Sequence, residues 1–206
     1  MDQRVDFEAQ EIVKAASVLA AHGWAPAGSG NYSHRYRDGA IAITVSGAHK
    51  GRLKVDEVMR LGPSGEPMDG RRPSAETPLH LMIYRRYPGA QAVLHTHSIA
   101  AVVLTRMVPE KGALQLAGYE LLKAFPGVET HDCAIELPIF DNDQDMTALA
   151  AEVAAALTAQ PAPAFLVRGH GLYGWGASMD EALGVVEAAE TMVACELEMM
   201  RTERGP

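Results

Sequence analysis

Apolar residues recur along the chain at two spacings, which predicts helices in some segments and strands in others. Residues 7–22 carry an apolar side chain on every third or fourth position, with Asp6 as a candidate N-cap and Gly23 as a stop. A longer stripe of the same kind follows residues 178–181, which fit a capping box, and reaches Met200. Both segments are expected to be amphipathic helices that pack on a core.

Short apolar runs between these two segments predict strands, and weaker helical patterns predict further helices. Strands are expected at the end of residues 28–35 and at residues 40–45, 90–97, 134–140, 165–167 and 172–175. Helices are expected at residues 77–86, 98–105, 118–125 and 146–157, and an irregular connection at the Gly- and Pro-rich residues 62–73. The sequence has no internal repeat or low-complexity linker, so we expect one α/β domain over residues 1–206, with helices flanking a central sheet.

Composition narrows the class of protein. A chain of 206 residues with 48% hydrophobic residues can bury the core of one domain. The net charge of −8 argues against a general nucleic-acid binder, which needs clustered Lys and Arg. Two cysteines are too few for a disulfide framework. The N-terminal residues lack the order of a signal peptide, and no apolar run reaches the roughly 18 residues that span a bilayer, so a cytoplasmic protein without a membrane partner is expected.

The strongest chemical signal is a pair of histidines, His95 and His97, at the end of an expected strand. Side chains two positions apart on a strand point to the same face, so the two imidazoles can meet over one point. A catalytic zinc usually takes three protein ligands and keeps an open position, and His170, between two glycines after a buried run, is the natural third candidate. The pair alone also fits two core or solvated histidines, so its meaning depends on its surroundings.

Three small-residue segments are candidate phosphate loops, because they offer free backbone N–H groups and hydroxyls. They contain Gly30 and Asn31, Ser46 and Gly47, and Ser74, with Lys50 as a nearby source of positive charge. Each segment taken alone also fits an ordinary tight turn.

Two carboxylates are candidates for proton transfer. Glu76 stands where a helix is expected to begin, and Glu120 stands in the expected helix at residues 118–125. Each has a plain alternative: Glu76 offsets the helix dipole, and Glu120 is an exposed helix residue. The acidic residues 141–145 lack the glycine and the final glutamate of a calcium loop, so a capped turn is the better interpretation.

In this order, residues 28–31, 46–47, 73–76, 95–98 and 168–171 resemble the class II aldolase/adducin-like family over nearly the whole chain. Within that family, residues 45–51, 115–123 and 137–145 look most like the lyases that dehydrate methylthioribulose 1-phosphate in methionine salvage. The resemblance implies a mostly antiparallel central sheet. It also implies a sugar-phosphate substrate and a cyclic homotetramer with active sites near subunit interfaces.

The same resemblance implies a role for each candidate residue. One zinc ion per subunit would be held by His95, His97 and His170, and Glu120 would transfer the proton. The substrate phosphate would be held by the loops containing Gly30, Asn31, Ser46, Gly47 and Ser74, with Lys50 nearby.

One position departs from the pattern of the family's aldolases, which carry two serines before the glutamate: here Ala75 takes the second place. This removes one hydroxyl from the expected phosphate loops. The residue matching Glu76 is zinc-near and catalytic in the family's aldolases, whereas some dehydratases carry a cysteine there, so the role of Glu76 stays open between a fourth zinc ligand that substrate displaces and a substrate contact. The alternative functions are a sugar-phosphate aldolase of the fuculose-phosphate type, a ribulose-phosphate 4-epimerase, or a metal-free scaffold as in the adducin branch. Retention of three histidines argues against the scaffold.

Overall fold

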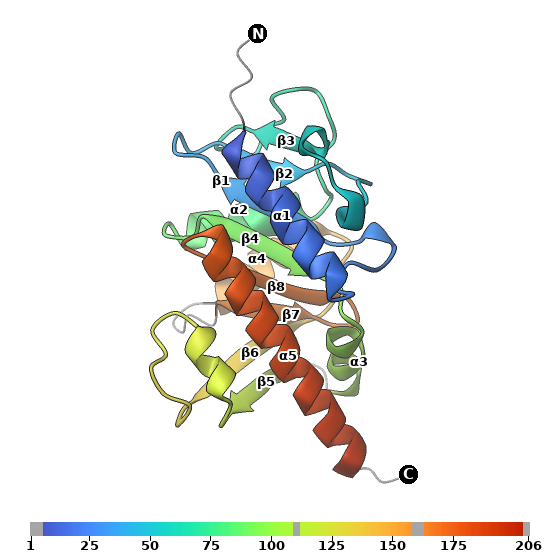
Figure 1. The fold of residues 1–206 in the computed structure, drawn as a ribbon, viewed down its shortest axis with the longest axis vertical. Coiled ribbons are helices and arrows are strands. Elements are labelled where there is room, and N and C mark those ends of the chain that lie inside the picture. The colour runs from blue at the N-terminus through green and yellow to red at the C-terminus, as the bar shows by residue number, and fades with distance from the viewer. Residues whose placement is uncertain (1–5, 109–111, 158–162, 204–206) are drawn as a thin grey trace.

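The computed structural model describes residues 6–108, 112–157 and 163–203. Eight strands form one sheet in the order β3-β2-β1-β4-β8-β7-β6-β5, with long helices on both faces (Figure 1). The strands are β1 (Asn31–Arg35), β2 (Ile41–Thr44), β3 (Val58–Leu61), β4 (Ala92–Thr96), β5 (Gly112–Ala117), β6 (Ala134–Phe140), β7 (Ala164–Val167) and β8 (Gly171–Gly176). The α-helices are α1 (Phe7–Ala21), α2 (Thr77–Arg86), α3 (Ile99–Met107), α4 (Met146–Ala156) and α5 (Met179–Glu203). Short 3₁₀ turns are η1 (Pro26–Gly28), η2 (Lys50–Arg52), η3 (Val55–Glu57) and η4 (Glu120–Ala124).

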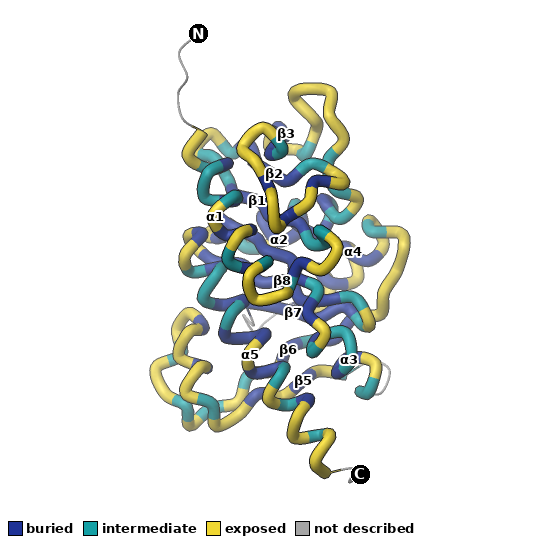
Figure 2. Tube along the Cα trace, turned by 45° about the vertical axis from the view of Figure 1, so that its right-hand side comes forward, coloured by how far each residue is buried: buried dark blue, intermediate teal, exposed yellow. Residues whose placement is uncertain are grey.

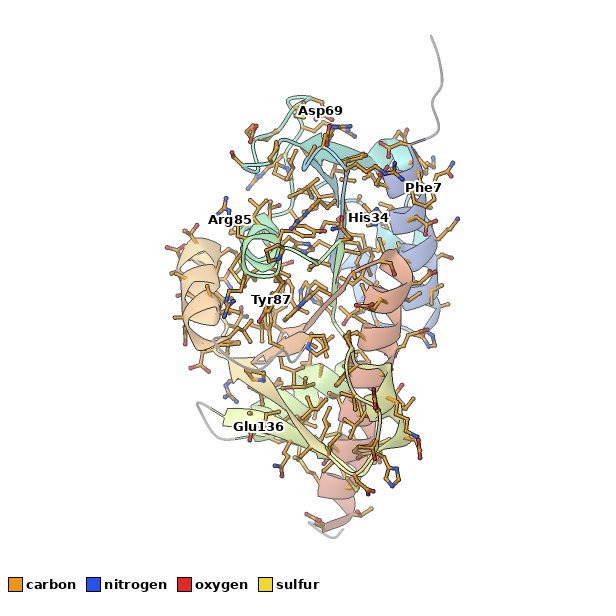
Figure 3. All side chains as sticks on the ribbon, turned by 90° about the vertical axis from the view of Figure 1, so that its left-hand side faces the viewer. Phe7, His34, Asp69, Arg85, Tyr87 and Glu136 are labelled. Atoms are coloured by element: carbon orange, nitrogen blue, oxygen red, sulfur yellow. The ribbon has the colours of Figure 1, made fainter. Side chains whose placement is uncertain are left out.

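The sheet is antiparallel except for the pairing of β6 with β7. Helices α1, α3 and α5 contribute to one apolar cluster with the sheet, and α2 and α4 contribute to a second cluster on the other face. Figure 3 shows α2 and α4 on one side of the sheet and α1 and α5 on the other. The expected α/β fold with a mostly antiparallel sheet flanked by helices is confirmed.

Strands β4 and β8 lie in the middle of the sheet and between the two helix layers, so they are buried along their whole length (Figure 2). A central buried strand cannot shift its register without moving its side chains to the wrong face. The ends of β4 and β8 are therefore rigid places on which to build a site.

Most expected elements are present within a few residues. The Asp6 side chain accepts a hydrogen bond from the amide of Ala9, as an N-cap should. The structure adds strands β3 and β5, which the pattern did not predict. In β5 only Leu114 and Leu116 are buried, and the alternating partners are alanine and glutamine rather than β-branched residues. The expected helix at residues 118–125 is only the 3₁₀ turn η4.

Among the described residues, none of the helices has the length and apolar character needed to cross a membrane.

Candidate active site

Three histidines from distant segments meet where β4 ends. β4 pairs with β8 so that His95 stands opposite Tyr173, and the short turn between β7 and β8 brings His170 to the end of β4. Glycine is required for this approach, because a Cβ on Gly171 would lie 1.8 Å from the carbonyl oxygen of Thr96. A Cβ on Gly30 would lie 2.5 Å from the carbonyl oxygen of His95. These glycines therefore let three chain segments come together around the histidines.

The ligand atoms of His95, His97, His170 and Glu76 all lie within 4.8 Å of one another. The Nε2 of His95 is 2.8 Å from the Nε2 of His97 and 3.3 Å from that of His170. Glu76 Oε1 lies 2.8 Å from His170 Nε2 and 3.4 Å from His95 Nε2. Ligands about 2.0–2.1 Å from a tetrahedral zinc would be separated from one another by about 3.3 Å. The cluster thus has the donor types and the dimensions of a metal site and can accommodate zinc.

Hydrogen bonds at Nδ1, the ring nitrogen that points away from the centre of the cluster, fix the orientation of two of the imidazoles. His95 Nδ1 lies 2.9 Å from the carbonyl oxygen of Leu172, and His170 Nδ1 lies 3.3 Å from Asn142 Oδ1. If each Nδ1 carries the proton and donates it, each Nε2 presents a lone pair to the centre of the cluster. Tyr173 stacks on the His95 ring with centroids 3.9 Å apart and limits its rotation.

Burial favours the neutral form of the third imidazole. It lowers the pKa of His97 to about 3, and the neighbouring His95 and His170 act in the same direction. A neutral imidazole is the form that binds a metal.

Glu76 occupies the N-cap position of α2, but its side chain makes no capping hydrogen bond. Its carboxylate instead faces the histidines and accepts a hydrogen bond from the side-chain amide of Asn31. Burial alone would raise the pKa of Glu76, yet its contacts with His95 and His170 hold it below its ordinary value. The plain alternative, a carboxylate that only offsets the helix dipole, does not describe this geometry.

Glu190 is a residue of this region that the sequence pattern did not identify. It lies buried on α5 and accepts hydrogen bonds from the hydroxyls of Thr96 and Ser98. Thr96 stands between the two histidines, and Ser98 caps α3 through the amide of Ala101. The available signal was an acidic residue inside the apolar stripe of the last helix.

The three candidate phosphate loops lie close to one another. An isolated bridge joins Val45 to Pro73, so the loops that carry Ser46 and Ser74 run side by side. The buried Lys50 donates to the carbonyl oxygens of Gly28, at 3.3 Å, and Ala48, at 2.6 Å, and so links the first loop to the second.

The charge of Lys50 is held in a low-dielectric environment. Burial lowers its pKa below the ordinary value, while Glu76 and Glu57 oppose that effect. Ser29 Oγ is buried and has no hydrogen-bond partner among the described residues. The side chain of Asn31 is engaged by Glu76 and His80.

Glu120 lies apart from these residues. It begins η4, its side chain is 69% exposed, and it pairs with Lys123 at 2.6 Å and with His131 at 3.3 Å. The hydrogen bond from Lys123 holds its pKa below the ordinary value. Figure 1 shows η4 as the yellow-green turn beside α5, on the part of the molecule that carries β5 and β6. A single chain does not place Glu120 in the histidine cluster.

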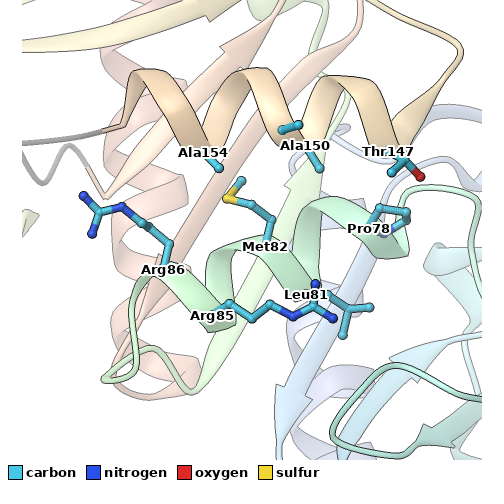
Figure 4. A pocket seen from close by; sticks show the side chains of 9 residues that line it. Pro78, Leu81, Met82, Arg85, Arg86, Thr147, Ala150 and Ala154 are labelled. Atoms are coloured by element: carbon cyan, nitrogen blue, oxygen red, sulfur yellow. The ribbon is translucent and has the colours of Figure 1, made fainter.

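A hollow of about 480 Å³ opens beside the cluster, a volume typical of small-molecule sites. It is lined by Pro26, His97, Ile99, Val102, Asn142, Gln144, Gly169 and His170. A larger groove of about 600 Å³ lies between α2 and α4 (Figure 4). Its walls include none of the clustered histidines, so the smaller hollow is the one that belongs to the site.

Comparison with known proteins agrees with this geometry. Residues 10–197 match the family model described as the class II aldolase and adducin N-terminal domain. A methylthioribulose-1-phosphate dehydratase of Marinobacter nauticus is 50% identical over 198 residues, covering 95% of each chain. A protein of the same name from Methylococcus capsulatus is 47% identical and covers 98% of this chain and 99% of that relative.

Solved structures of aldolases have the same fold as this chain. The crystal structure of L-fuculose-1-phosphate aldolase from Thermus thermophilus superposes with a TM-score of 0.74 at 26% identity, covering 96% of each chain. An L-fuculose 1-phosphate aldolase at 21% identity superposes with a TM-score of 0.78, covering 98% of this chain and 89% of the other. The chain belongs to the class II aldolase and adducin N-terminal domain family.

Proposed function

We propose that this protein is a zinc-dependent hydro-lyase of methionine salvage. It converts 5-methylthioribulose 1-phosphate to 2,3-diketo-5-methylthiopentyl 1-phosphate and water. The convergence of three imidazoles and one carboxylate within 4.8 Å carries the proposal of a metal-dependent reaction. The identity of about half of all residues to dehydratases of nearly equal length supports the choice of substrate.

His95, His97 and His170 would hold the zinc ion, and Glu76 Oε1 would complete the ligand set before substrate binds. A bound zinc ion supplies a Lewis acid that polarises the substrate ketone and stabilises negative charge on its oxygen. The outer hydrogen bonds of His95 and His170 keep their Nε2 atoms directed at the cluster. The protein therefore provides an orientation that does not have to be created during the reaction.

Glu120 acts as the base in this proposal. It removes the proton from the carbon next to the ketone, and the electrons of that C–H bond move first onto the ketone oxygen and then form a double bond to the following carbon. The hydroxyl on that following carbon leaves and takes the proton from Glu120, so one water is released and the carboxylate is restored. The enol product then rearranges to the diketone.

The exposed position of Glu120 fits a site shared between subunits. We propose a cyclic homotetramer in which Glu120 of one subunit reaches the histidine cluster of the next. Coverage of the side chain by a neighbouring subunit would raise its pKa, opposite to the effect of Lys123 in the single chain. A base is most effective when its pKa is close to the working pH.

The two ends of the substrate would bind different surfaces. The phosphate would bind the loops of Gly30, Ser46, Gly47 and Ser74. The buried Lys50, which donates to carbonyl oxygens of the first two loops, would supply positive charge. Asn31 belongs to the first of these loops, although its side chain serves Glu76. The apolar methylthio end would lie in the hollow beside His97, against the apolar residues Pro26, Ile99 and Val102.

Product analysis tests the proposal. Purified protein is assayed for zinc and then incubated with methylthioribulose 1-phosphate, and the products are identified by NMR and mass spectrometry. A diketone with the loss of one water is the expected result. Two carbon fragments would indicate an aldolase, for which the L-fuculose-1-phosphate aldolase fold is the supporting observation. An epimeric sugar would indicate an epimerase, and protein without metal or turnover would indicate a scaffold.

A further inference from the structure

A buried row of polar side chains leads from Glu76 into the core between β1 and α2. Asn31 and Ser33 are two positions apart on β1, and Glu76, His80 and Tyr84 are four positions apart along α2 and its N-cap. These spacings place each set on one face of its element. The two sets alternate as Glu76, Asn31, His80, Ser33 and Tyr84 along a continuous series of hydrogen bonds. We call this series the β1–α2 row.

Apart from Glu76 at its end, the row is isolated from solvent. Asn31, Ser33, His80 and Tyr84 are each at most 5% exposed. Ser33 Oγ lies 2.7 Å from His80 Nδ1 and 2.8 Å from the hydroxyl of Tyr84. Asn31 Nδ2 donates to Glu76 Oε2, and His80 Nε2 contacts Asn31 Oδ1. Buried polar groups that are fully paired in this way specify one arrangement of the side chains.

The carboxylate of Glu76 determines which group donates and which accepts in each hydrogen bond of the row. An ionised carboxylate only accepts hydrogen bonds, so Asn31 must turn its NH₂ group toward Glu76 and its oxygen toward His80. His80 must then carry a proton on Nε2. Burial lowers the pKa of His80 to about 3, which leaves it a single ring proton, so its Nδ1 accepts from Ser33. Because Ser33 uses its proton on His80, the hydroxyl of Tyr84 donates to Ser33, with the Gln91 carbonyl oxygen 3.4 Å away as a second acceptor.

We propose that His80 is a positioning residue for the metal site. Through Asn31 it holds Glu76 Oε2 on the side of β1, and this leaves Glu76 Oε1 directed at the Nε2 atoms of His95 and His170. This inference rests on the proposed metal site and adds a group that does not touch metal or substrate. Residues that orient metal ligands typically change metal affinity by about 10- to 100-fold when they are removed.

Zinc affinity measured by competition with a chromophoric chelator tests this role. His80→Leu removes both ring nitrogens at similar volume and is expected to bind zinc about 10- to 100-fold more weakly. His80→Gln keeps an N–H group that can reach Asn31 Oδ1 and is expected to restore most of the affinity. Tyr32→Phe is the matched control, because the Tyr32 hydroxyl is buried on the same strand and has no hydrogen-bond partner among the described residues. An equal loss in Tyr32→Phe would overturn the inference.

A double-mutant comparison separates positioning from general support of the fold. In a Glu76→Gln background, His80→Leu should cause no further loss of zinc affinity, because its effect passes through the Glu76 carboxylate. An unchanged loss in that background would show that His80 acts by another route. If His80→Leu does not fold, Ser33→Ala serves the same comparison, since it removes only the hydroxyl that contacts His80 Nδ1.

A failure of the proposed metal site can be distinguished from a failure of the inference about His80. If the wild-type protein takes up no zinc, the proposed function falls, and ¹⁵N NMR of the metal-free protein still decides the arrangement of the row. A His80 ring protonated on Nε2 supports the inference. A ring protonated on Nδ1 contradicts it, because Asn31 could not then accept from His80.

Discussion

Glu190 on α5 accepts a hydrogen bond from Thr96, the residue that stands between His95 and His97. The second carboxylate oxygen of Glu190 accepts a hydrogen bond from Ser98. One side chain of α5 therefore binds the residues on both sides of His97. Strand geometry turns His95 and His97 to one face of the chain and Thr96 to the other. Helix α5 thus supports the cluster from the opposite face of the chain and contributes none of its proposed metal ligands.

Replacement of Glu190 should destabilise the protein. Glu190→Ala leaves the hydroxyls of Thr96 and Ser98 buried without acceptors, at a cost of about 1–3 kcal/mol for each unsatisfied group. The free energy of unfolding, measured in urea, should fall accordingly. Glu187→Ala, at an exposed position on the same helix, is the control and should have little effect. Equal stability of the two variants would remove Glu190 from this supporting role.

The stability contributed by Glu190 should depend on pH. Burial raises its pKa, and the hydrogen bonds from Ser98 and Thr96 oppose this only partly. A carboxyl whose pKa is higher in the folded protein contributes stability that is full below the ordinary value of 4.5 and is lost as the pH rises through the folded value. Glu190→Gln cannot ionise, so its unfolding free energy should decline less than that of wild type over this window. Parallel pH profiles for the two proteins would contradict the assignment.

Removal of a proposed ligand should abolish stoichiometric zinc binding. His97→Ala deletes one of three imidazoles whose Nε2 atoms meet in the cluster. Elemental analysis after dialysis should find little zinc in this variant and near one equivalent in wild type. His22→Ala is the control, because His22 is exposed and pairs with Glu187. Unchanged zinc in His97→Ala would refute the ligand assignment.

The sequence predicted the histidines of the cluster, but it did not predict the buried residues that hold them in place. The reason is physical. His95 lies in β4 and His97 directly follows its last residue, so their spacing in an extended segment predicts that they face the same way. His80 and Glu190 are held by partners far away in the sequence, such as Asn31 and Thr96. Local spacing carries no information on which buried polar groups will meet. Burial of Glu190 in an apolar stripe was the available hint, and the hydrogen bonds that permit it depend on the folded arrangement.

Loss of the Lys50 charge should weaken substrate binding more than metal binding. Its Nζ is held by two loop carbonyl oxygens next to the proposed phosphate site. Lys50→Met should raise KM by roughly 10- to 100-fold, since a hydrogen bond to a charged group contributes about 1.5–3 kcal/mol. Zinc content should be unchanged. Lys54→Met, at an exposed neighbouring position, should keep the wild-type KM. A wild-type KM in Lys50→Met would place the phosphate elsewhere.

The hollow beside His97 should determine selectivity for the apolar end of the substrate. Ile99 is 75% exposed and forms part of its wall. Ile99→Ser should lower kcat/KM for methylthioribulose 1-phosphate by about tenfold and leave kcat/KM for ribulose 1-phosphate, which has a hydroxyl at that end, nearly unchanged. Val55→Ser, at an exposed position outside the hollow, provides the comparison. An equal loss with both substrates would contradict this placement.

Glu120 should act on the cluster of a neighbouring subunit. Glu120→Gln is expected to keep its fold and its zinc and to lose most turnover, because the amide cannot remove the proton. Co-expression with His97→Ala should restore activity, since some assemblies combine an intact cluster from one chain with an intact Glu120 from the other. A complete site needs an intact cluster on one subunit and an intact Glu120 on the next, and each occurs in half of the chains. Random mixing in a cyclic assembly therefore gives about a quarter of the wild-type number of complete sites.

The control for this experiment is a mixture of Glu76→Gln and His97→Ala, which damage the same cluster and cannot complement each other. Native mass spectrometry should show the mixed tetramers in both preparations. Restored activity in the first mixture alone would support a site built from two subunits. Because Glu120 is 69% exposed in the single chain, an inactive first mixture would show that contact between subunits does not bring it to the histidines.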